Sequence, residues 1–239
     1  MNKILITQPT FLPWLGYFDL IDQADILVFL DDVQLDKRSW QTRNKIKLNQ
    51  DAQWISIPII SKNLSKQTIK NTLINKNELK INKIFNLIHH GYSKSEFYSH
   101  YKLKLFSVFE KCASNFKLIK LNLCLINFLL LNFGIKKKIF YSSSLGIKTQ
   151  RSNKIIEICK KFKCNSLISS YGSNNYLEND ISLFRRNEID VFLQNYRHPN
   201  YKQITEPFIS HLSALDLLFN EGPKSFEIIK SGREKLIKL

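Results

Sequence analysis

Short apolar runs alternate with segments of helical periodicity along most of the chain. This alternation predicts strands at residues 4–7, 26–30, 52–60, 138–145, 165–170 and 190–196. It predicts helices at residues 14–23, 77–89, 95–113, 121–133, 151–162, 178–187 and 211–219. Strands alternating with helices favour a parallel sheet covered on both faces. We therefore predict an α/β fold, a three-layer sandwich with a mostly parallel, Rossmann-like sheet. The chain is expected to form a single domain, 1–239, with a helical insertion at about 77–133.

The composition is that of a globular protein, with 44% hydrophobic and 12% aromatic residues. The most apolar segment, 121–135, contains three asparagines and is shorter than the roughly 20 apolar residues of a spanning helix. We therefore predict a buried helix there and no membrane span. The start of the chain has no signal-peptide pattern, and the four cysteines lack metal or redox spacing. We expect reduced, mostly buried thiols in a cytoplasmic protein.

The net charge of +16 is compatible with three polyanionic partners: nucleic acid, a membrane surface or a phosphate-bearing substrate. No motif of a nucleic-acid-binding module is present, so we do not expect nucleic acid as a partner. Neither glycine-rich phosphate-binding pattern occurs, and two adjacent aspartates are a weak metal signal. The sequence therefore identifies no cofactor and no metal site.

Polar residues follow the predicted strands at the points where these strands end. Gln8 follows the first strand, and Asp31 and Asp32 follow the second. In parallel sheets, ligands bind beyond the carboxyl ends of the strands. Adjacent residues of a strand point to opposite faces, so one aspartate is expected to face the site and the other to be structural. Asp31 is predicted to bind substrate, as are the following residues after the later strands: Tyr171, Gly172, Asn174, Tyr196, Tyr201 and His211.

A basic cluster occupies residues 33–47, directly after the second strand. Arg38 and Arg43 suit bidentate binding of phosphate, Trp40 suits stacking on a base or a sugar, and Asn44 lies beside them. A nucleotide-linked sugar requires both cations and an aromatic surface. The alternative is a solvated hairpin whose salt bridges each contribute under about 1 kcal/mol.

The best-placed histidine is His198, which lies just past the last predicted strand and before Pro199. Its intrinsic pKa suits general acid or base catalysis. We predict that His198, Asp32 and Gln8 form the catalytic group in one pocket. A carboxylate beside the imidazole would raise the pKa of His198.

A resemblance to the WbqC-like protein family is carried by four segments: "QPTFLPWLGYFDLIDQADILVFLDDVQ", "KRSWQTRNKIK", "YGSNNYL" and "QNYRHPNYKQ…FISHLSALDLLFNEG". The resemblance spans nearly the whole chain and implies a role in bacterial surface-polysaccharide gene clusters, such as those for O-antigen. The first unit is also similar in layout to nucleotidyltransferases with a histidine-rich first loop, although this loop contains no histidine.

Three functions are compatible with these observations. The first is an enzyme that transfers an acyl or aminoacyl group from a small donor to a nucleotide-linked amino sugar. Its base would be His198 or one of the paired aspartates, with Gln8 stabilising the oxyanion. The second is a glycosyltransferase-like enzyme in which Asp32 binds a metal or acts as the base. The third is a binding or scaffold protein for polysaccharide assembly that has no catalytic activity.

Overall fold

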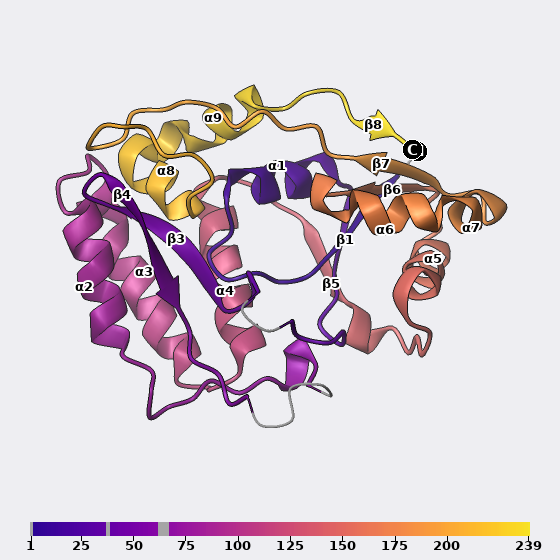
Figure 1. The fold of residues 1–239 in the computed structure, drawn as a ribbon, viewed down its shortest axis with the longest axis horizontal. Coiled ribbons are helices and arrows are strands. Elements are labelled where there is room, and N and C mark those ends of the chain that lie inside the picture. Colours follow the sequence, from indigo (N-terminus) through magenta and orange to yellow (C-terminus); the bar gives the residue numbers. More distant parts are fainter. Residues whose placement is uncertain (1, 37–38, 62–66) are drawn as a thin grey trace.

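A central sheet organises the chain in the computed structural model, which describes residues 2–36, 39–61 and 67–239. Within these residues the strand order is β5-β2-β1-β6-β7-β8 (Figure 1). The strands are β1 (Lys3–Thr7), β2 (Ile26–Phe29), β5 (Lys138–Tyr141), β6 (Ser166–Ser169), β7 (Asp190–Leu193) and β8 (Ile237–Lys238). The first five are parallel and β8 pairs antiparallel to β7. The predicted α/β class and mostly parallel sheet are confirmed.

Side chains alternate across this sheet and pack into two separate cores. Leu5 and Leu27 face a core shared with helices α1 (Leu15–Gln23), α8 (Ala214–Glu221) and α9 (Ser225–Ser231). The neighbouring strand residues Ile4 and Val28 face the second core, which lies beneath three further helices. These helices are α5 (Arg151–Lys161), α6 (Asn174–Asn179) and α7 (Ile181–Arg186). Because successive residues of a strand point to opposite faces, both faces of the sheet are apolar and covered.

The chain between β2 and β5 forms a hairpin and three long helices, which lie together on the left in Figure 1. These elements are β3 (Arg43–Leu48), β4 (Asp51–Ser56), α2 (Ile81–Tyr92), α3 (Tyr98–Ala113) and α4 (Leu118–Asn132). Short 3-10 turns occur at η2 (Ile69–Asn71), η3 (Ser142–Ser144), η4 (Tyr171–Ser173) and η5 (Gly222–Lys224). The predicted buried helix is α4. None of the described helices is long and apolar enough to cross a membrane.

Three local predictions need correction. The predicted strand 52–60 ends at Ser56 and pairs antiparallel with β3, outside the central sheet. The helix predicted at 178–187 is instead two short helices, α6 and α7, and a 3-10 turn at Tyr171–Ser173 leads into α6. The helix predicted at 77–89 begins at Ile81 and continues through Gly91 to Tyr92. A Cβ on Gly91 would lie 2.3 Å from the carbonyl oxygen of Lys47, so glycine here permits close approach of the helix to β3.

The expectation of four reduced thiols is wrong for two of the cysteines. Cys112 in α3 and Cys124 in α4 form a disulfide, with Cα atoms 6.5 Å apart. Cys159 and Cys164 are free and buried. Helices α3 and α4 are joined by a short turn and pack against each other, which brings residues 12 positions apart into contact. No spacing motif predicts this pairing, because it depends on how the two helices pack.

Candidate functional site

A cavity of about 1420 Å³ opens at the carboxyl ends of β1, β2, β6 and β7. The chain passes from β1 to β2 on one side, whereas β6 pairs with the other side of β1. This reversal of strand order is a topological switch point, where open α/β sheets bind their ligands. We call it the switch-point cavity.

The structure brings eight of the predicted site residues to this cavity and leaves five others outside its lining. Those that line it are Gln8, Asp32, Trp40, Asn44, Tyr171, Gly172, Tyr196 and His211. Those outside its lining are Asp31, Arg43, Asn174, His198 and Tyr201. Arg38 lies outside the described residues.

Hydrogen bonds from helix α1 and from the segment before β3 hold Gln8 in place. The hydroxyl of Tyr17, on α1, donates a 2.9 Å hydrogen bond to the carbonyl oxygen of Gln8. The amide nitrogen of Gln41 donates to the side-chain oxygen of Gln8. Among the described residues, no group accepts a hydrogen bond from the side-chain nitrogen of Gln8. This nitrogen is therefore a donor available to a ligand.

Two buried asparagines fix the loop that follows β1. Asn44 donates from its side-chain nitrogen to the carbonyl oxygen of Leu12 at 2.6 Å. Asn122, which is fully buried in α4, donates to the carbonyl oxygens of Pro9 at 3.1 Å and Gln41 at 2.9 Å. Buried carbonyls that lose such partners are costly, so these amides hold the cavity wall in one conformation.

The paired aspartates have different surroundings. Asp31 is buried and accepts hydrogen bonds from the backbone nitrogen of Ser143 at 2.9 Å and its hydroxyl at 2.7 Å. It therefore joins the ends of β2 and β5. Asp32 faces the cavity and pairs with Lys154 at 2.7 Å. Burial raises the pKa of Asp32, but hydrogen bonds from Lys154 and Ser142 outweigh this effect, so the pKa lies below its ordinary value.

The two histidines of the C-terminal half stack against Trp14. His211 lines the cavity, 5.0 Å from the Trp14 ring centroid. His198 lies behind it, 6.1 Å from Trp14 and 4.9 Å from His211. Burial and the neighbouring His211 lower the pKa of His198 to about 4. The prediction that a carboxylate raises this pKa is therefore wrong. The side chains packed against His198 are aromatic rings, which carry no negative charge.

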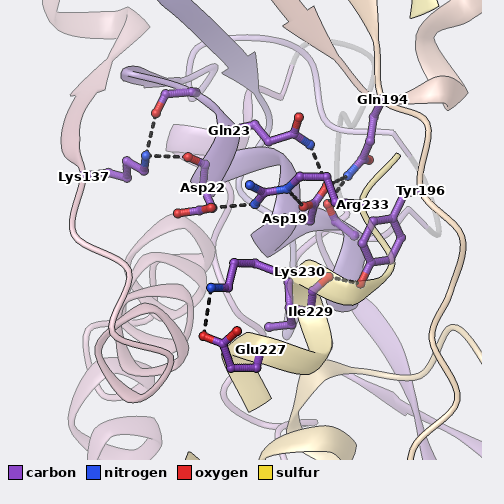
Figure 2. Close-up of polar contacts among 12 residues, drawn as sticks. Asp19, Asp22, Gln23, Lys137, Gln194, Tyr196, Glu227, Ile229, Lys230 and Arg233 are labelled. Carbon is purple, nitrogen blue, oxygen red and sulfur yellow. Dashed lines mark hydrogen bonds and ion pairs between the residues drawn. The ribbon is translucent and has the colours of Figure 1, made fainter. Parts of the chain in front are cut away.

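A buried ion pair supports the wall formed by Gln194 and Tyr196 (Figure 2). Arg233 donates from Nε to Asp19 at 2.7 Å and from its terminal nitrogen to Asp22 at 2.5 Å. Gln194 donates to the other oxygen of Asp19 at 2.8 Å. The backbone of Tyr196 pairs with that of Arg233. The C-terminal segment therefore fixes the residues that follow β7.

Sequence reasoning missed several lining residues, notably Arg151, Lys154, Gln194 and Tyr176. A signal was available for two of them. Arg151 and Lys154 lie in the first turns of the helix that follows β5, and in parallel α/β units such turns lie at the carboxyl edge of the sheet. Gln194 carries no such signal, because its partner Asp19 is 175 residues away.

Two of the remaining predicted residues, Tyr201 and Arg43, have partners outside the cavity. Tyr201 donates a 2.7 Å hydrogen bond to the buried carboxylate of Asp216. Arg43 lies over the ring of Trp54, with its guanidinium carbon 4.4 Å from the ring centroid. Asn174 begins α6, next to the cavity wall formed by residues 170–173.

The mostly parallel sheet and the cavity at its switch point define an α/β protein with a Rossmann-like sheet and a candidate ligand site. The chain belongs to the WbqC-like protein family, whose match covers residues 8–228. It is also similar to a protein of Mycobacterium tuberculosis described as the uncharacterized protein Rv1507c. The identity is 29% over 236 residues, which is 98% of this chain and all of the relative. No solved structure matches the chain.

Proposed function

We propose that this protein is a transferase that moves an acyl or aminoacyl group from a small donor to the amine of a nucleotide-linked sugar. The setting is the assembly of a bacterial surface polysaccharide such as O-antigen, as the family resemblance implies. The observation that carries the proposal is the switch-point cavity. Its volume of about 1420 Å³ exceeds the roughly 300–1,000 Å³ of sites for one small ligand, which leaves room for two substrates.

We assign the diphosphate to the start of α5. Gln150, Arg151 and Ser152 line the cavity there, and the first turn of α5 contains no acidic residue. Unpaired backbone N–H groups at a helix start favour an anion. Arg151 has no ion-pair partner among the described residues, so its charge is available to a phosphate. This assignment moves the phosphate contact from Arg38 and Arg43 to Arg151.

His211 takes the role of general base in this proposal, in place of His198. It lines the cavity, and burial lowers its pKa, so the imidazole is neutral at pH 7 and can accept a proton. The sugar amine attacks the acyl carbonyl carbon, and a C–N bond forms. The bond from that carbon to the donor's leaving group then breaks. His211 takes the amine proton and passes it to the leaving group, while the free amide nitrogen of Gln8 stabilises the oxyanion.

Backbone geometry supports this assignment. His211 and Arg151 adopt positive φ angles of 59° and 52°, which non-glycine residues rarely adopt. Such conformations cost about 1–3 kcal/mol and cluster at ligand and catalytic sites. Both residues line the switch-point cavity, although they are 60 positions apart in the sequence.

Isothermal titration with UDP- and dTDP-linked amino sugars tests the proposal. We expect one of these sugars to bind wild-type protein, and Arg151→Gln to weaken that binding about tenfold with an unchanged thermal midpoint. Lys160→Gln is the matched control, because Lys160 is exposed at the far end of the same helix. Equal affinities for wild type and Arg151→Gln, or no binding by any of the sugars, would overturn the proposal.

A further inference from the structure

An exposed face of the β3–β4 hairpin, together with the turn that precedes β3, carries two tryptophans and two cations, which we call the tryptophan face: Trp40, Trp54, Arg43 and Lys45. In the antiparallel ladder Lys45 lies opposite Trp54, and Arg43 is the diagonal neighbour on the same face. The intervening residues on the other face, such as Ile46 and Ile55, are buried. Trp54 and Trp40 remain 36% and 52% exposed.

The other three side chains of the tryptophan face each contact Trp54. The ring centroids of Trp40 and Trp54 are 5.5 Å apart, with an interplanar angle of 35°. The guanidinium carbon of Arg43 lies 4.4 Å from the Trp54 centroid, and the Lys45 ammonium nitrogen lies 5.0 Å from it. Cation–π contacts of this kind hold the cations beside the rings. The result is an aromatic surface with positive charge along its edge.

The charge of this face is not neutralised within the described part of the chain. Neither Arg43 nor Lys45 forms an ion pair there. Exposed indoles also forfeit the roughly 25 cal/mol per Å² that burial would contribute. A ligand that places a flat ring on the indoles and an anion beside the cations would bury the exposed indole surface and neutralise the two charges. A purine nucleotide has both groups, whereas a neutral pyranose offers no anion to the two cations.

The tryptophan face is continuous with the switch-point cavity. Trp40 lines the cavity as well as contacting Trp54. Its carbonyl oxygen accepts a 2.8 Å hydrogen bond from the backbone nitrogen of Phe11, which belongs to the same loop as Gln8. A ligand stacked on Trp40 can therefore extend into the cavity toward Gln8.

We infer that the tryptophan face binds the adenine nucleotide handle of a small acyl donor, a pantetheine-linked thioester. The adenine stacks on Trp40 and Trp54, and its phosphates contact Arg43 and Lys45. The thioester then reaches into the cavity, where the C–N bond forms at the thioester carbon, the C–S bond then breaks, and His211 passes the amine proton to the departing thiolate. This inference rests on the proposed function, because it names the donor of that transfer.

Intrinsic fluorescence tests the inference directly, because the chain contains only three tryptophans, two of them in the tryptophan face. Coenzyme A and 3′,5′-adenosine diphosphate serve as probes. We expect both to quench the emission of wild-type protein on titration. Stacking of one base on an aromatic side chain corresponds to about a ten- to hundredfold change in affinity on truncation. Trp54→Ala should therefore lower the affinity for both probes by this factor, and Trp54→Phe should restore part of that affinity.

Charge variants provide the second arm of the test. Arg43→Gln should weaken binding of both probes about tenfold. Lys76→Gln is the matched control, because Lys76 makes a cation–π contact with Phe116 and is not a cavity residue. None of these substitutions alters the buried side of the hairpin. The far-ultraviolet circular dichroism of each variant should therefore match that of wild type.

The outcomes separate this inference from the proposed function. If amino-sugar nucleotides bind in an Arg151-dependent manner and coenzyme A does not bind, the donor assignment is wrong and the proposed function stands. If Trp54→Ala weakens the nucleotide sugar instead of coenzyme A, the face belongs to the sugar substrate and the inference fails. Binding of a short single-stranded RNA without binding of coenzyme A would also refute it. Coenzyme A binding that depends on Trp54, without any sugar-nucleotide binding, would support the face and overturn the proposed function.

Discussion

The ion pair between Asp19 and Arg233 allows a quantitative prediction about how the cavity wall is stabilised (Figure 2). The Asp19 side chain is fully buried, whereas that of Arg233 is 30% exposed. Arg233→Met removes the cation and leaves a buried carboxylate, a change that typically costs about 3–5 kcal/mol. Asp19 keeps hydrogen bonds from Gln23 and Gln194, each 2.8 Å long. We therefore expect the free energy of unfolding to fall by an amount near the lower end of this range, about 3 kcal/mol.

Equilibrium unfolding in urea at pH 7 measures this loss through the shift in midpoint at an unchanged denaturant slope. The double variant Asp19→Asn with Arg233→Met should be more stable than Arg233→Met alone, because it no longer buries an unpaired charge. Such a recovery corresponds to a coupling energy of about 0.5–3 kcal/mol. The control is Lys238→Met, because the Lys238–Asp190 pair is 57% and 40% exposed. Its loss should be under about 1 kcal/mol.

Two results would refute this reasoning. One is a stability of Arg233→Met within about 1 kcal/mol of wild type, which would mean that the buried carboxylate does not need the guanidinium. The other is strict additivity in the double variant, which would mean that the two charges do not interact. A loss of about 3 kcal/mol is large against the roughly 5–15 kcal/mol that stabilise a typical domain.

Three further predictions concern histidine, asparagine and cysteine. The folded-state pKa of His198, about 4, lies below the unfolded value near 6.5, so its contribution to stability is complete above pH 6.5 and is lost as the pH falls toward 4. His198→Gln should lose less stability than wild type between pH 7.5 and 5 in urea titrations, and equal losses would contradict this. Asn122→Leu removes the donor from two buried carbonyls and should cost about 1–3 kcal/mol, whereas a neutral result in thermal and urea unfolding would contradict the role of Asn122. The Cys112–Cys124 disulfide closes a loop with a sequence separation of 12, so Cys112→Ser should cost about 3 kcal/mol. Reduced wild-type protein should match that variant, and identical midpoints for reduced and oxidised wild type would contradict the disulfide's contribution.

The apolar patterns determined the sheet and the edge of the sheet at which the site lies. Each parallel strand is a short apolar run, because both faces of the sheet are buried, and β1 and β5 are each followed by a helix with an apolar face. The strands share one carboxyl edge, so Gln8 and Asp32 were predicted to lie together, and both line the switch-point cavity. The spacing of apolar residues suffices to predict the strands and their carboxyl edge, because the periodicity of a strand or helix depends on residues close together in the sequence.

Only the tertiary structure decided which member of each candidate pair faces the cavity. Asp31 turns to Ser143 and Asp32 to Lys154, and His211 lines the cavity while His198 lies behind it. Each of these choices depends on side chains far apart in the sequence: 122 positions separate Asp32 from Lys154. Such contacts are set by how helices pack on the sheet. The sequence therefore determined the edge at which the site lies, and packing decided which side chains occupy it.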